Sequence, residues 1–219
     1  RNDALETTTS SNRDRIRLQL NASSAIDSKT KVAFGVRTGT TKSGWNDMGD
    51  NNGVKTIGLN LAYVEYAAAS FAKVTLGKMN RPWSSDALFY DNDIKPEGLA
   101  VALKHGSGLT ASAFKLKLSE GGTAVDSDVV GAQVGYGKKF YGIEFAGSAA
   151  KLNQTTVSPT PQKFDQLVVN LSAKTNVVNV PVKAFAEQVT NSSASTLNKA
   201  TAVGITISEA NKAGNWEVS

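Results

Sequence analysis

The sequence predicts an all-β protein, a transmembrane antiparallel up-and-down β-barrel. Apolar and polar residues alternate with a period of two in about twelve segments, which is typical of strands with one apolar and one polar face. No window of eleven residues keeps apolar positions at the three- and four-residue spacing of a helix. The segments are joined alternately by short and long connections, as in barrels that have tight turns on one side of a membrane and loops on the other.

The first expected strand begins at Arg15, where Ile16 and Leu18 alternate with Arg15 and Arg17. The same alternation predicts further strands over residues 32–37, 57–63, 73–77, 99–104, 113–118, 130–136, 141–146, 166–172, 182–187 and 203–208, and a last one that begins at 216–218. The long connections cover residues 38–53, 79–98, 120–128, 151–163 and 191–199. The whole chain is therefore expected to form one β-barrel domain over residues 1–219.

Composition excludes several classes of site. The chain has 24 Lys and Arg against 19 Asp and Glu, and these are spread over almost every segment, whereas a nucleic-acid reader gathers its basic residues in one patch. There is no cysteine and only one histidine, which excludes disulfides and zinc clusters, so neither a metal nor a cofactor is expected. The longest apolar run, residues 99–103, is far too short for a transmembrane helix of about 20 residues.

A soluble β-sandwich gives the same alternation, with solvent on the polar face and a core behind the apolar face. In this chain the polar face is rich in Gly, Ala, Ser and Asn, small groups that leave space in a lumen. A closed barrel also pairs every backbone N–H and C=O, which lipid requires. The pattern favours the barrel, and a sandwich with a carbohydrate-binding face remains the alternative.

Strand alternation assigns side chains to two environments. Residues expected to line the pore are Arg15, Arg17, Arg37, Lys104, Lys115, Lys117, Lys183, Glu144 and Glu187. Residues expected to face lipid are Ile16, Leu18, Leu20, Ile57, Leu59, Leu61, Phe114 and Leu116. The basic residues could form a cationic ladder that favours anions, since lumen charges tune selectivity. Alternatively, they are solvated side chains, some of them paired with Glu144 or Glu187.

The connection over residues 79–98 is long and carries both aromatic and acidic residues. Its candidate constriction residues are Arg81, Trp83, Asp86, Asp91, Asp93 and Glu97. Long loops are often functional, and this one could fold inward to narrow the pore and face a basic wall. An external loop packed on its neighbours is the other interpretation.

Several stretches resemble the bacterial "putative porin" family. They include RDRIRLQLNASSAIDSKTKVAFGVRTG (residues 13–39), IGLNLAYVEY (57–66) and, most specifically, LGKMNRPWSSDALFYDNDIKPEGLAVAL (76–103), with Gly-Lys-Met, an aromatic after Pro and Asp…Pro-Glu-Gly. The resemblance implies an outer-membrane diffusion porin, similar in architecture to phosphate-selective porins, with a barrel of about sixteen strands and a trimeric assembly. It also implies a chain that is incomplete at both ends.

The sequence thus predicts a porin of the bacterial outer membrane, a water-filled channel for small hydrophilic solutes with an anion bias. Its partners would be the lipid bilayer, lipopolysaccharide, anionic or neutral solutes and further copies of itself in a trimer, but not nucleic acid. A structural or adhesive barrel with a plugged lumen is a second possibility. No catalytic residues are expected, because no Ser/His/acid set stands out, so an enzyme is the least favoured class.

Overall fold

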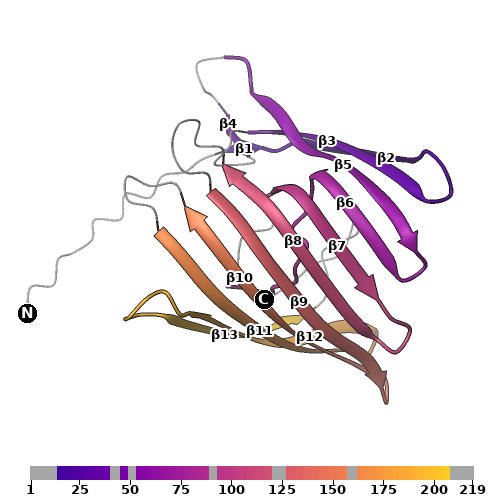
Figure 1. The fold of residues 1–219 in the computed structure, drawn as a ribbon, viewed down its shortest axis with the longest axis vertical. Coiled ribbons are helices and arrows are strands. Elements are labelled where there is room, and N and C mark those ends of the chain that lie inside the picture. Colours follow the sequence, from indigo (N-terminus) through magenta and orange to yellow (C-terminus); the bar gives the residue numbers. More distant parts are fainter. Residues whose placement is uncertain are drawn as a thin grey trace, which may run out of the picture.

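The computed structural model describes residues 14–39, 45–48, 53–88, 93–119, 127–156 and 162–207. Within these residues the protein is built from strands and turns, without a helix (Figure 1). None of the described segments is a helix that is long and apolar enough to cross a bilayer.

Most strands match the alternating segments of the sequence and extend beyond them. The strands are β1 (Arg15–Ile16), β2 (Gln19–Ala25), β3 (Thr30–Thr38), β4 (Asn46–Asp47), β5 (Ile57–Ala69), β6 (Ala72–Lys78), β7 (Glu97–Lys104), β8 (Leu109–Ser119), β9 (Ser127–Phe140), β10 (Ile143–Thr156), β11 (Gln162–Val177), β12 (Val180–Asn191) and β13 (Lys199–Ile207). The strand expected from Arg15 is interrupted at residues 17–18, β4 lies in the expected connection 38–53, and residues 141–142 form a turn. The strand expected at 216–218 lies outside the described residues.

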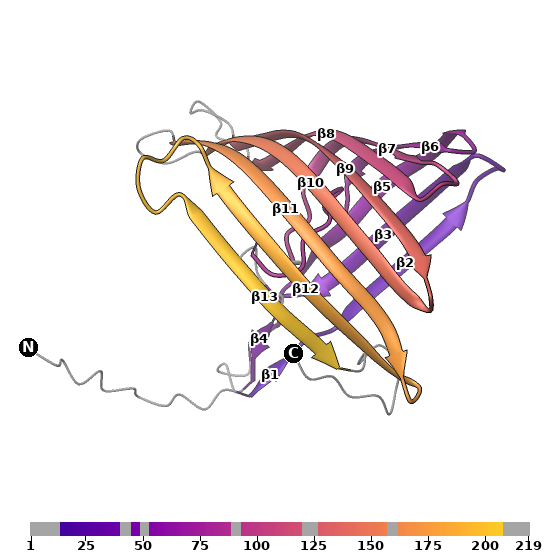
Figure 2. The ribbon, with the colours of Figure 1, turned by 90° about the horizontal axis from the view of Figure 1, so that it is seen from below.

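Eleven of the strands form one antiparallel sheet in the order β13-β12-β11-β10-β9-β8-β7-β6-β5-β3-β2. Apart from β1 and β4, which pair with each other in a separate two-stranded sheet, each strand lies beside its neighbour in sequence, which is the up-and-down arrangement. The large sheet is strongly curved (Figure 2), and within the described residues its edge strands β2 and β13 are not paired to each other. It therefore has a concave and a convex face.

One end of the sheet carries short turns. Tyr141 and Gly142 connect β9 to β10 with φ values of 46° and 83°, the positive values that a tight hairpin with a right-handed twist requires. Between β2 and β3, Asp27 Oδ1 accepts hydrogen bonds from the backbone N–H groups of Lys29 and Thr30, both at 2.7 Å. The longer connections lie at the opposite end, as the sequence predicts.

The convex face is apolar over most of its height. Leu76, Leu99, Leu171 and Ile205 are all exposed there, with 44 to 60% of their surface accessible. Exposed aromatic residues lie close to the short turns, namely Tyr66, Phe71, Tyr136, Phe140, Tyr141 and Phe145. An apolar outer band that ends in aromatic residues is the surface of a barrel embedded in a membrane.

A bulge changes the faces of β5 and overturns one part of the prediction. Gly35 pairs with Leu61 and Val36 with Leu59, so Asn60 is the extra residue. Because a bulge shifts the alternation by one residue, Leu59 remains exposed whereas Leu61 is buried on the concave face. The expectation that Leu61 faces lipid is therefore wrong.

Strand β8 also has its faces opposite to those expected. Phe114 and Leu116 are 5% and 1% exposed and belong to the buried cluster on the concave face, whereas Lys115 and Lys117 are exposed on the convex face. The physical reason is that an inward loop covers the concave side of β8, so its large apolar residues are buried by protein rather than by lipid.

Candidate functional site

The described parts of the connection between β6 and β7, residues 79–88 and 93–96, lie against the concave face of the sheet. Met79 and Trp83 are 3% and 4% exposed and pack into a cluster with buried residues of β7 to β11. The Trp83 and Phe114 rings lie 4.9 Å apart between their centroids, at 34° to each other. Burial of two large apolar side chains anchors the loop inside the curve of the sheet.

A reciprocal amide contact holds the next residue of the loop. The backbone N–H of Ser84 donates to Gln133 Oε1 at 2.9 Å, and Gln133 Nε2 donates to the Ser84 carbonyl at 3.1 Å. Gln133, on β9, thereby pairs with this loop residue as a neighbouring strand would. The same Nε2 group lies 3.2 Å from Ser148 Oγ on β10, which orients the amide.

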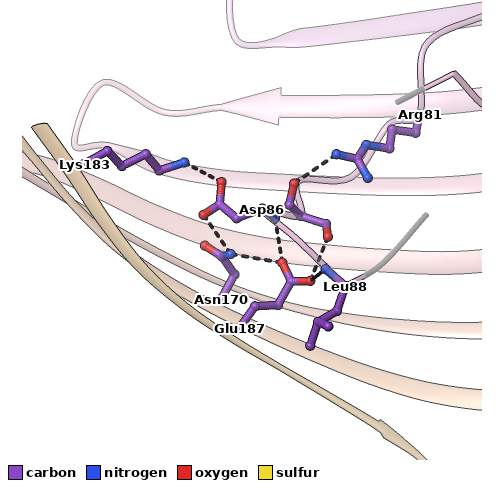
Figure 3. A network of polar contacts seen from close by, with 7 residues as sticks. Arg81, Asp86, Leu88, Asn170, Lys183 and Glu187 are labelled. Carbon is purple, nitrogen blue, oxygen red and sulfur yellow. Dashed lines mark hydrogen bonds and ion pairs between the residues drawn. The ribbon is translucent and has the colours of Figure 1, made fainter. Parts of the chain in front are cut away.

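Glu187 is the main polar anchor of the loop (Figure 3). Its carboxylate, on β12, accepts hydrogen bonds from Ser85 Oγ at 2.9 Å and from the backbone N–H groups of Asp86 and Leu88 at 2.6 and 2.7 Å. Asn170 Nδ2 on β11 donates to it at 3.1 Å. Glu187 is 1% exposed, and these four donors stabilise its buried charge.

Asp86 extends this network toward the open space. Its carboxylate pairs with Lys183 of β12 and accepts a hydrogen bond from Asn170 Nδ2 at 3.0 Å. Arg81 Nη2 donates to the Ser85 carbonyl at 2.9 Å and bridges two turns of the loop (Figure 3). Two carboxylates therefore hold the loop against β11 and β12. Glu187 belongs to the sheet and accepts hydrogen bonds from the loop, whereas Asp86 belongs to the loop and contacts side chains of the sheet.

The far part of the loop meets the other side of the sheet. Asp93 accepts hydrogen bonds from Arg17 Nη2 at 2.7 Å and Nη1 at 3.3 Å, and Arg37 Nη1 lies 3.3 Å from the same carboxylate. Arg17 also lies over the ring of Trp45, 5.7 Å from its centroid. The described parts of the loop thus contact β11 and β12 at one place and the arginines beside β2 and on β3 at another.

Lys95 adds a further cation beside Asp93. It lies in the loop, outside the strands, and burial lowers its pKa from the ordinary value of 10.5. Asp93 opposes this shift, while the nearby charges of Arg37, Arg81 and Arg17 lower the pKa further. Among the described residues, Lys95 is therefore influenced by three arginines and by the carboxylate of Asp93.

The structure brings together only part of the residues expected to line the pore. Strand alternation puts five of them on the concave side, namely Arg37, Lys104, Glu144, Lys183 and Glu187, and Arg17, between β1 and β2, contacts the loop through Asp93. Arg15 does not share a strand with Arg17, because residues 17 and 18 separate β1 from β2, and it pairs with Asp47 at 3.2 Å. The two arginines therefore contact different acids and are not neighbours on one face of a strand.

Other candidates lie elsewhere. Lys115 and Lys117 project from the convex face of β8, so their assignment to the pore is wrong. Glu97 begins β7 on the same face and pairs with Lys78 at 2.8 Å, outside the constriction loop. Asp91 lies outside the described residues.

Of the residues expected to face lipid, Ile16, Leu18, Leu20, Ile57 and Leu59 are exposed.

Sequence reasoning missed Gln133, Asn170 and Lys95. Gln133 and Asn170 are 9% and 7% exposed, and both occur on the polar face of a strand among small residues. A long amide among Gly, Ala and Ser would have been the available signal, because a buried amide needs partners. Lys95 had no distinguishing signal in the sequence, because the same loop contains several other charged residues.

The chemistry of this site is electrostatic and steric. Within the described residues no group of three or more His, Cys, Asp or Glu side chains could hold a metal ion. The anchored loop lies on the concave side, with Arg17 and Arg37 of the wall at Asp93 and with Glu187 of the wall at residues 85–88. A curved up-and-down sheet with an apolar convex face and such an inward loop defines a channel-forming membrane β-barrel.

Comparison with known proteins agrees with this class. Residues 2–140 match the family described as "Putative porin", and the chain belongs to that family. The OmpF porin of Salmonella typhi, solved in complex with daunomycin, has a similar fold with a TM-score of 0.50 at 10% identity, covering 89% of this chain and 77% of that one. A mutant of the Rh. blastica porin gives a TM-score of 0.40 at 13% identity, covering 88% and 79%. No curated protein matches the chain significantly.

Proposed function

We propose that the protein is an outer-membrane porin that provides a water-filled path for small hydrophilic solutes and favours anions. The observation that carries this proposal is the far part of the loop, where Arg17 and Arg37 contact the carboxylate of Asp93 and Lys95 lies close enough to sense the charges of Arg17, Arg37 and Arg81. An excess of positive charge at a constriction lowers the energy of an anion there relative to a cation.

The opposite side of the constriction supports the same direction of selectivity. Asp86 is paired with Lys183, and Glu187 is buried under the loop and receives four hydrogen bonds. These carboxylates are therefore compensated locally and contribute little field to the open path. Among the described residues, cations outnumber carboxylates at the far part of the loop, which favours anionic over cationic solutes.

The test is the reversal potential of the protein in a planar bilayer under a salt gradient. Arg17→Ser combined with Arg37→Ser should reduce the preference for chloride over potassium, because two cations leave the constriction. Lys115→Ser combined with Lys117→Ser is the matched control, since it removes the same charge from the convex face of β8. The control should keep the anion preference of the wild type.

Equal effects of the two double variants would contradict the proposed selectivity site. A wild-type protein that inserts into the bilayer but carries no current would contradict the channel itself and favour a barrel with a plugged lumen. A trimeric assembly in contact with lipopolysaccharide belongs to the same proposal, and mass measurement of the detergent-purified protein tests the trimer.

A further inference from the structure

A shallow apolar groove runs over the convex face of β9 to β12, in the half nearer the short turns. Its convex-face lining comes from Tyr136, Phe145 and Leu171 and from the small residues Gly147, Ala173 and Ala184. It is separate from the constriction loop, which lies on the other face of the sheet. The groove therefore has no part in the proposed path for solutes.

Small residues create this groove between larger neighbours. Tyr136 is opposite Gly147 in the register of β9 and β10, and Gly147 is opposite Leu171 in β11. A Cβ atom at Gly147 would lie only 2.9 Å from Leu171 Cδ2, so the leucine side chain occupies the space that the glycine leaves. Ala173 and Ala184 continue the floor in the next row of the sheet.

One cation lines the groove. Lys138 is exposed on the convex face, opposite Phe145 and two residues before the end of β9. The convex-face residues around it on β9 and β10 are Tyr136, Phe140, Ile143, Phe145 and Gly147, so no carboxylate of these described strands faces it. A lysine in an apolar wall extends its ammonium group to the headgroup level, where lipid phosphates are available as counter-ions.

We propose that this groove binds one phospholipid, with an acyl chain lying along Gly147, Ala173 and Ala184 and the phosphate at Lys138. The apolar lining suits the chain, and the lone cation suits the anionic headgroup. The site rests on the membrane location that it shares with the proposed porin function, but it does not require current through the lumen.

The test uses the full chain purified in detergent and native mass spectrometry with dioleoyl phosphatidylglycerol or dioleoylglycerol as the probe. The wild type should retain one phosphatidylglycerol and bind it more tightly than the neutral dioleoylglycerol. Lys138→Gln should weaken phosphatidylglycerol about fivefold and remove that preference, in line with the contribution of one lysine near a charged surface. Ala184→Trp should abolish retention, because its side chain fills the groove.

Two matched variants control for folding and for general surface effects. Val203→Trp places the same bulky residue on the convex face outside the groove lining, and Lys115→Gln removes a convex lysine far from it. Both should bind phosphatidylglycerol like the wild type. Unchanged lipid retention in Ala184→Trp would overturn the proposal, and if that variant also dissociates an oligomer, the face is an interface between copies. Conductance of Ala184→Trp should be unchanged, so loss of lipid and loss of current are separable.

Discussion

At the scale of single residues, the surroundings of Lys95 decide how the constriction responds to pH. Burial favours the neutral amine, and Arg17, Arg37 and Arg81 add repulsion that Asp93 only partly offsets. The pKa of Lys95 in the folded protein therefore lies below that of an unfolded lysine. Between these two pKa values the unfolded chain binds more protons, so this residue makes stability rise with pH.

We predict that the anion preference of the wild type falls as the pH is raised toward 10.5, because Lys95 loses its charge below that ordinary lysine value. Lys95→Met should show a lower preference already at neutral pH and should lack this fall. Reversal potentials measured over a pH series test the prediction. Lys104→Met, which removes a concave lysine at the short-turn end, should retain the fall. An identical pH profile in Lys95→Met and the wild type would contradict the assignment.

At the scale of elements, the loop keeps its inward position because the concave face of the sheet offers it a buried apolar cluster and hydrogen-bond acceptors. Trp83 packs on Phe114, and Glu187 receives two backbone N–H groups and one hydroxyl from the loop. A loop of this length would otherwise leave buried backbone donors unpaired, which is costly. The position of the loop therefore depends on its contacts with Glu187 of β12 and with Phe114 of β8.

Glu187→Gln should weaken the attachment of the loop to β12. The substituted amide keeps the size of the side chain but offers one acceptor oxygen where the carboxylate has two, so at least one loop donor loses its partner. We expect a loss of about 1–3 kcal/mol in stability, the cost of one orphaned buried donor. Single-channel recordings should show higher conductance and more open-channel noise, and thermal unfolding in detergent should occur at lower temperature.

The control for this prediction is Glu65→Gln, which removes a carboxylate 3.0 Å from Lys73 in a more exposed ion pair. Such pairs contribute less than about 1 kcal/mol, so this variant should resemble the wild type. Open-channel noise that stays at the wild-type level in Glu187→Gln would mean that the loop position does not depend on this carboxylate.

At the scale of the whole molecule, the curved sheet separates two solvents. Leu171 is 60% exposed on the convex face, and Ser172, its neighbour in β11, points to the concave face. A membrane makes such an apolar surface favourable, whereas in a sandwich the same leucine would be covered by a second sheet. Residues 171 and 172 therefore probe the environments of the convex and the concave face, respectively.

Because the chain contains no cysteine, Leu171→Cys and Ser172→Cys each provide one labelling site. A fluorophore at residue 171 should be quenched by brominated lipids in vesicles and not by aqueous iodide. A fluorophore at residue 172 should respond to iodide and not to brominated lipids. Absence of lipid quenching at residue 171 would contradict contact between the convex face and the bilayer.

Some features follow from the chain itself because they depend on local spacing. The period of two fixes strands, and the alternation of short and long connections fixes an up-and-down order, so β9 and β10 are predictable from the Val130 and Tyr141 segments alone. Arg37 and Lys183 lie on the concave side, the side that alternation assigns to them, and their role in lining a pore stays a prediction.

Which face an apolar residue uses is not a local property where a bulge or a buried loop intervenes. The extra residue Asn60 shifts the alternation, so Leu61 lies on the concave face. Phe114 and Leu116 also lie on the concave face, where they are buried in one cluster with Trp83 of the loop. Alternation alone cannot distinguish burial under a loop from burial in lipid, because both remove apolar surface from water. The chain thus determined its strands and their order, whereas tertiary packing decided which side of β8 is lined by protein and which cations meet at the constriction.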